Sequence, residues 1–166
     1  PLTIDPSIAY GQWLGDGTSG VSTAAAVAVE VGTGEIYVGG TAAGLLLNVG
    51  TIVGTYVGTV GTAEGYVVEL TSANPPVINW MHYLGGAAGA TITSLAVNGD
   101  EVYAGGYSTV SSSWETAGST LGSVVNSGYE AFVVEIADGV SPILAWRVWV
   151  GGTGGDDIYA IAINGD

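Results

Sequence analysis

The sequence predicts an all-β protein made of antiparallel four-stranded sheets of the β-propeller blade type, with about two and a half repeats in the chain. Short runs rich in Val, Ile and aromatic residues recur along the 166 residues, each bounded by Gly, Asn, Asp or Pro. Such runs are typical of strands. The runs also return in the same order, and four short strands per repeat is the habit of a propeller blade.

Four elements recur. The first occupies residues 6–16, 76–86 and 142–152, so its copies are offset by 70 and 66 residues, and each copy combines a Pro, two aromatic residues three positions apart and a Gly. The other three occupy residues 94–100 and 160–166, residues 35–40 and 101–106, and residues 64–70 and 130–136. Asn98-Gly99 lies between two of the runs and predicts a hairpin, because a tight turn requires positive φ at its centre.

The order of these elements divides the chain into four parts. We expect residues 1–16 to be the last strand of a preceding blade and residues 17–86 to be the first blade-type repeat. Residues 87–152 then form the second repeat, and residues 153–166 the first strand of a following blade. A closed propeller has at least four blades. The chain is therefore either a stretch of a longer propeller or a subunit that combines with copies of itself through open strand edges.

The composition excludes several classes of partner. Fifteen acidic residues stand against one basic residue, Arg147, for a formal charge of −14. Nucleic acids and anionic membranes require clustered Lys and Arg, so we expect no nucleic-acid partner. Glycines interrupt the most apolar stretch, residues 45–60, so we also expect no membrane insertion. The absence of Cys removes disulfides and thiolate chemistry. A surface of Gly, Ser and Thr favours a secreted or cell-surface protein.

Several motifs resemble the SBBP family of β-propeller repeats. They are the run Glu-Ala-Phe-Val-Val-Glu-Ile at 130–136, Trp146 with Gly151-Gly152, the acids at 156 and 157, and the runs Ile-Ala-Ile-Asn-Gly-Asp and Val-Tyr-Ala-Gly-Gly. The resemblance covers nearly the whole chain. The chain departs from the family at Glu69 and Glu135, where the family has Lys, and in two long connections. The resemblance implies an extracellular or surface protein and carries no catalytic signature.

Acidic residues in glycine-rich turns are candidate calcium ligands, because Ca²⁺ prefers oxygen donors. The alternative is that they simply form turns. Asp156 and Asp157 are the best pair, and no other cofactor is predicted. The remaining acids of this kind are Asp16, Asp100, Glu101 and Asp138.

No catalytic residue is predicted. His82 is the single histidine, and a catalytic His would need an acid and a nucleophile beside it. Glu69 and Glu135 occupy equivalent positions in the two repeats, which indicates a structural role rather than a glycosidase-like pair.

Pairs of aromatic residues three positions apart face opposite sides of a strand. One member of each pair is expected to pack between blades, and the other could stack on a sugar. The candidate ligand-binding residues are Trp80, Tyr83, Trp146 and Trp149.

The sequence therefore predicts a non-enzymatic structural or scaffold protein that is extracellular or on the cell surface. The alternative is a carbohydrate- or calcium-dependent binding module of a larger propeller. The uncharged segment 41–62 is interpreted either as an extra strand or as an apolar contact surface.

Overall fold

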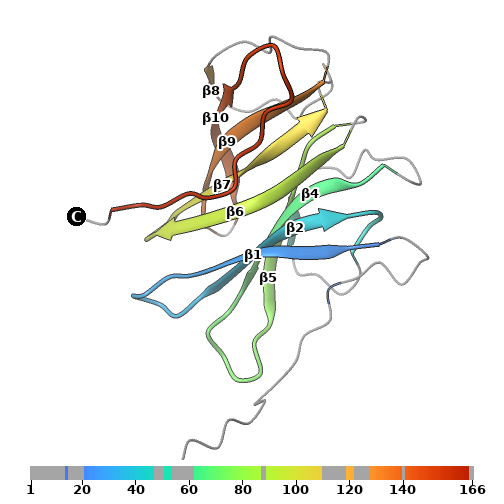
Figure 1. Ribbon diagram of the computed structural model, residues 1–166. Helices are drawn as coiled ribbons and strands as arrows, with labels where there is room; N and C mark the ends of the chain where they lie inside the picture. Colours follow the sequence, from blue (N-terminus) through green and yellow to red (C-terminus); the bar gives the residue numbers. More distant parts are fainter. Residues whose placement is uncertain are drawn as a thin grey trace, which may run out of the picture.

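A computed structural model describes residues 14, 21–46, 51–53, 62–86, 89–109, 119–121, 128–139 and 141–164. These residues form ten strands and no helix (Figure 1). Accordingly, the described part of the chain contains no helix with the length and apolarity needed to cross a membrane. The prediction of an all-β protein is confirmed.

The strands form two sheets of the same design. In each sheet four strands run antiparallel to their neighbours in chain order, and a short fifth strand lies parallel to the last of them. The first sheet contains β1 (Thr23–Val29), β2 (Ile36–Ala42), β3 (Thr51–Val53), β4 (Glu64–Leu70) and β5 (Ile78–Leu84). The second contains β6 (Ala90–Asn98), β7 (Glu101–Thr109), β8 (Ser119–Leu121), β9 (Tyr129–Ala137) and β10 (Ile143–Val150).

The predicted four-stranded antiparallel sheets are thus confirmed, and β3 and β8 extend them. Both short strands come from the long connections between the second and third main strands. β3 lies inside the segment 41–62, so the interpretation of that segment as an extra strand holds for residues 51–53.

The two sheets also share their register. Tyr37 of β2 lies opposite Glu69 of β4, and Tyr103 of β7 lies opposite Glu135 of β9, each residue shifted by 66 positions. The first pairing of each sheet contains an irregularity at the same place, between Ala24 and Ala26 in β1 and between Ile92 and Ser94 in β6.

A glycine stands opposite each irregularity because no other residue fits. A Cβ on Gly40 would overlap the carbonyl oxygen of Thr23, and a Cβ on Gly106 would overlap that of Thr91. Both obstacles are backbone atoms, which a side-chain rotation cannot move aside. These two glycines therefore allow the strand backbones to approach at the bulge.

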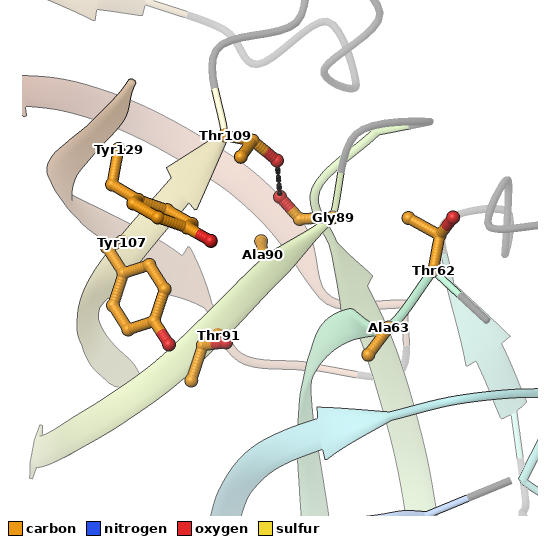
Figure 2. Close-up of a pocket in the computed structure, with 8 residues that line it drawn as sticks. All are labelled: Thr62, Ala63, Gly89, Ala90, Thr91, Tyr107, Thr109 and Tyr129. Atoms are coloured by element: carbon orange, nitrogen blue, oxygen red, sulfur yellow. Dashed lines mark hydrogen bonds between the residues drawn. The ribbon is translucent and has the colours of Figure 1, made fainter.

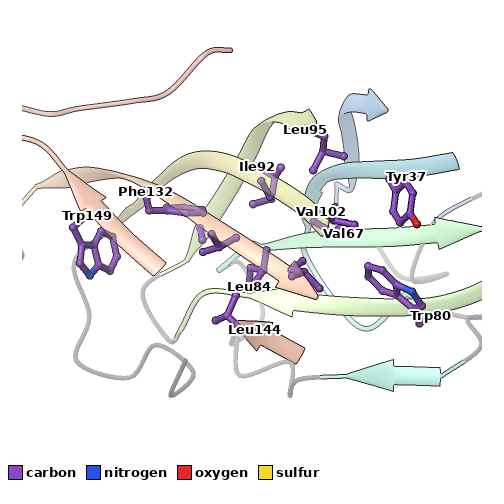
Figure 3. Close-up of a cluster of buried hydrophobic side chains, with 14 residues drawn as sticks. Tyr37, Val67, Trp80, Leu84, Ile92, Leu95, Val102, Phe132, Leu144 and Trp149 are labelled. Atoms are coloured by element: carbon purple, nitrogen blue, oxygen red, sulfur yellow. The ribbon is translucent and has the colours of Figure 1, made fainter. Parts of the chain in front are cut away.

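The two sheets pack face to face around one apolar core (Figure 3). Trp80 and Leu84 belong to this core from the first sheet. Ile92, Phe132 and Ile136 belong to it from the second sheet. All of these side chains are buried. Gly39 lies directly under Ile92, and a Cβ added to Gly39 would lie 2.8 Å from Ile92 Cγ2. The absence of a side chain at Gly39 thus lets β6 come close to the first sheet.

The opposite face of the first sheet is also covered. Tyr66, Val68, Met81 and Tyr83 pack there with Leu46, and the Tyr83 hydroxyl accepts a hydrogen bond from the Leu46 amide at 2.8 Å. Both faces of the first sheet are therefore inside the protein, and every residue of β4 is buried.

The C-terminal segment covers part of the outer face of the second sheet, running beside β6 in Figure 1. Residues 151–164 pair with no strand of the described chain, although a strand was expected over 153–166. Ile158 and Ile161 nevertheless lie over Gly105 as Ile92 and Leu95 lie over Gly39. Of the strand expected over 1–16, only residue 14 lies within the described residues.

Candidate functional site

An acidic residue of the second repeat, Asp138, accepts hydrogen bonds from two side chains of the first repeat. Asp138 follows β9, and its Oδ1 accepts a hydrogen bond from Trp80 Nε1 at 2.7 Å. Its Oδ2 accepts a second one from the Tyr37 hydroxyl. The Tyr37 and Trp80 rings lie tilted against each other, with centroids 6.1 Å apart. One carboxylate thus satisfies the polar atoms of two buried rings on the neighbouring sheet.

Two glutamates of the first repeat, one just before β2 and one in β4, lie beside this contact. Carboxylate oxygens of Glu35, Glu69 and Asp138 all lie within 4.8 Å of one another. Burial raises the pKa of Glu69 from 4.5 to about 7, with the charge of Asp138 adding to the effect and a hydrogen bond from Asn79 opposing it. Burial, followed by the hydrogen bond to Asp138, also raises the pKa of Tyr37.

The three carboxylates offer oxygen donors that lie close enough together to hold a divalent cation. The sequence had named Asp138 as a turn acid and candidate calcium ligand, and Glu69 as a structural strand residue, but it did not bring these two together or nominate Glu35. Strand register places the two glutamates near each other, because Glu69 of β4 lies opposite Tyr37 of β2 and Glu35 is two residues before Tyr37. The register could therefore have indicated this part of the cluster. Among the described residues, no comparable cluster includes Asp156 or Asp157.

Replacement of Glu69 by Gln is expected to change the pH dependence of stability. The unfolded chain releases this proton near pH 4.5, whereas the folded chain holds it until about pH 7. Between these values the folded state binds more protons, so stability falls as the pH rises. Glu69→Gln should remove this fall and raise the free energy of unfolding at neutral pH by on the order of 1 kcal/mol.

Denaturant unfolding across this pH range measures the effect. Glu135→Gln is the matched control at the equivalent position, and it should retain the slope because Glu69 is unchanged. An identical slope in wild type and Glu69→Gln would contradict the prediction.

The equivalent ring pair in the second sheet has different partners. Tyr103 and Trp146 lie 6.0 Å apart, in nearly the same tilted arrangement as Tyr37 and Trp80. Trp146 Nε1 donates to Glu135 of its own sheet, and the Tyr103 hydroxyl donates to Glu101 at 2.9 Å. The same positions thus use carboxylates within the sheet, whereas in the first sheet Asp138 comes from the next repeat.

Two pockets lie where the repeats meet at one end of the sheets. The first has a volume of about 370 Å³ (Figure 2), and a hydrogen bond from Thr109 Oγ1 to the Gly89 carbonyl, 3.3 Å long, spans part of its wall. Its lining residues are Thr62, Ala63, Gly89, Ala90, Thr91, Tyr107, Thr109 and Tyr129. The second has a volume of about 320 Å³ and is lined by Tyr107, Tyr129, Gly155, Asp156 and Asp157.

The aromatic residues that the sequence nominated for ligand binding line neither pocket. Trp80, Tyr83 and Trp149 are buried, and Trp146 is half-buried. The two rings of the Trp80 and Tyr83 pair do face opposite sides of the sheet, as expected, but both sides are covered. Neither ring therefore offers a face to a sugar in this structure. The exposed aromatic at the pockets is Tyr129, which carries no repeat signal in the sequence.

The nominated acids do reach a pocket. Asp156 Oδ2 accepts a hydrogen bond from the Gly152 amide at 2.9 Å. Asp157 Oδ1 is buried and has no hydrogen-bond partner among the described residues.

The single histidine, His82 in β5, and the single arginine, Arg147 in β10, are both buried. His82 Nδ1 lies 2.9 Å from the carbonyl oxygen of Tyr83. The Arg147 guanidinium lies over the Trp149 ring, 5.1 Å from its centroid, and burial lowers the pKa of Arg147. These contacts are those of strand residues in a core.

A scan against protein-family models and a search of curated proteins found nothing that matches this chain.

Proposed function

We propose that the chain is a structural module of a secreted or cell-surface repeat protein of the β-propeller type, without catalytic activity. In this proposal each four-stranded sheet presents one face to the sheet of the next repeat. The observation that supports it is a difference between equivalent positions. Residues buried on the inner face of the first sheet recur, 66 positions later, on the outer face of the second sheet.

The burial of these positions differs as the proposal requires. Val67 and Leu84 of the first sheet are completely buried. Their equivalents are Val133, which is half-buried, and Val150, which is 49% exposed. Apolar residues that recur at an uncovered face are typical of an interface that another unit covers.

The geometry of the contact also supports a continuing series. The face of the second sheet that meets the first, with Phe132 and Val134, is equivalent to the far face of the first sheet, with Tyr66 and Val68. Two different faces thus meet. Such head-to-tail contacts generate closed rings when the rotation closes, and a propeller is a ring of this kind.

Addition of a third repeat tests the proposal. Residue 166 is equivalent to residue 100, so a copy of residues 101–152 placed after residue 166 continues the chain in register. We expect the longer protein to unfold in one cooperative step at a higher temperature, because the added sheet covers Trp146 and Val133. The added copy of Asp138 should accept a hydrogen bond from the Trp146 indole.

Calorimetry and tryptophan emission give the readouts. The matched control is the same extension carrying Val133→Arg, which places a charge on the covered face. If the third repeat unfolds separately at a lower temperature and leaves Trp146 emission unchanged, the proposed stacking is wrong.

The location outside the cell rests on composition. Only 10% of the residues are charged, so Gly and the neutral hydroxyl residues Ser and Thr make up much of the surface. A surface of this kind favours a secreted or cell-surface protein. The carbohydrate- or calcium-binding alternative has one specific observation in its favour, the pocket that contains Asp156 and Asp157.

A further inference from the structure

We propose that the pocket lined by Tyr107, Tyr129, Gly155, Asp156 and Asp157 binds a neutral saccharide. By its equivalence to the first pocket, this site lies at the edge where a following repeat would meet the second sheet. The proposal rests on three features of the pocket: its relation to the first pocket, the chemistry of its walls, and the ligands that its charge disfavours.

The second pocket repeats the backbone of the first. In the first pocket the Ala90 amide donates to the Ala63 carbonyl at 3.1 Å. In the second the Asp156 amide donates to the Tyr129 carbonyl at 3.0 Å, with both residues shifted by 66 positions. The same backbone contact between two segments therefore occurs in both pockets, with different side chains around it.

At three equivalent positions, the second pocket has larger or charged side chains where the first has small neutral ones. Positions occupied by Ala63, Ala90 and Thr91 in the first pocket are occupied by Tyr129, Asp156 and Asp157 in the second. The first pocket shows that small neutral residues are sufficient for the fold at these positions. One large ring and two carboxylates are thus additions that the backbone does not require. The ring is exposed and the two acids are half-buried, and added aromatic and polar groups at the edge of a pocket point to binding.

The walls suit a sugar ring. Tyr107 and Tyr129 meet edge to face with centroids 5.2 Å apart, and Tyr129 is 52% exposed. The exposed ring offers an apolar surface to the C–H face of a pyranose. A Cβ on Gly155 would meet nothing within 4 Å, so the mouth of the pocket has room for a ligand. A volume of about 320 Å³ lies at the lower end of the range for small-molecule sites.

The carboxylates supply acceptors for hydroxyl groups. The Gly152 amide fixes the orientation of Asp156. Asp157 Oδ1 is buried without a hydrogen-bond partner among the described residues, and a buried acceptor without a donor is costly. A sugar hydroxyl seated against the Tyr129 ring would supply that donor.

Charge narrows the class of ligand. The formal charge of −14 and two carboxylates in the wall disfavour anionic ligands, including uronic acids and phosphates. Calcium is a poorer fit, because Asp156 and Asp157 belong to no three-acid cluster in the described part of the chain. A neutral polyhydroxyl ligand uses both the ring and the acceptors.

Isothermal titration of the 166-residue chain with four disaccharides tests the proposal. The probes are cellobiose, maltose, lactose and N,N′-diacetylchitobiose, with CaCl₂ alone and choline chloride as further arms. We expect at least one disaccharide to bind, and Tyr129→Ala and Asp157→Thr each to weaken its affinity about tenfold or more. Both substitutions install the residue of the first pocket, so the thermal unfolding temperature should change little.

Asp100→Asn is the matched control, because it also removes one acidic charge but lies in the β6–β7 turn, away from the pocket. Its affinity should equal that of the wild type. The proposal is overturned if none of the disaccharides binds, if only calcium or choline binds, or if the two pocket variants retain wild-type affinity. None of these results bears on whether a third repeat stacks on the second sheet.

Discussion

Gly106→Ala is expected to lower the free energy of unfolding by more than about 3 kcal/mol, or to prevent folding. The added methyl group would overlap the carbonyl oxygen of Thr91 in the neighbouring strand β6. Strands β6 and β7 can relieve this overlap only by separating, which would break their hydrogen bonds at the bulge. β6 also contributes to the core between the sheets, so the damage should extend to both repeats.

Gly152→Ala is the matched control, because a Cβ at Gly152 would meet nothing within 4 Å. Its free energy of unfolding should stay within about 0.5 kcal/mol of the wild type. Denaturant unfolding followed by circular dichroism measures both variants, and the yield of folded protein reports a Gly106→Ala chain that does not fold. Equal stability of the two variants would show that the bulge is not built as described.

The second large effect is expected from Trp80→Ala, at about 3–5 kcal/mol. The indole is 1% exposed, lies in the core between the sheets and donates a hydrogen bond to Asp138. Its removal leaves a cavity and deprives the Asp138 carboxylate of a partner. Trp146→Ala changes the equivalent residue, but the Trp146 ring is half-buried. We expect that loss to stay below about 2 kcal/mol.

Thermal and denaturant unfolding of the two variants, measured side by side, give the comparison. The pair is its own control, because the same residue is changed at the same position of each sheet. A loss at Trp146 as large as that at Trp80 would mean that the outer face of the second sheet is covered in solution. It would contradict the difference in burial on which the stacking proposal rests.

The strands were predictable because the same runs of β-branched and aromatic residues occur in both repeats. A single run such as residues 101–106 has an ambiguous local preference. Its copy at residues 35–40 supports the prediction of a strand, and the two runs lie in the equivalent strands β7 and β2 of the two sheets. Gly-bounded runs of β-branched and aromatic residues then fix where each strand begins and ends. The parallel strands β3 and β8 were less accessible, since each has three residues within a long connection.

The sites were less predictable, because they depend on contacts between repeats. Register within the first sheet brings Glu69 near Tyr37, but Asp138 reaches them only because the second sheet stacks on the first. The repeat signal also drew attention to Trp80 and Tyr83, which repetition marks as packing residues. Tyr129 breaks the repeat, since its counterpart is Ala63, and departures of this kind are the better guide to binding residues in a repeated fold.

The indole N–H signal of Trp80 tests the stacking of the repeats most directly. It is measured by ¹⁵N–¹H nuclear magnetic resonance in wild type and Asp138→Asn, with Trp80→Phe to assign the signal. The described contact predicts a shift of the Trp80 signal and faster hydrogen exchange in Asp138→Asn, because a charge-assisted bond becomes a weaker neutral one. The Trp146 signal should not move, since Trp146 donates to Glu135. If the Trp80 signal and its exchange rate are the same in both proteins, the second repeat does not stack on the first as described.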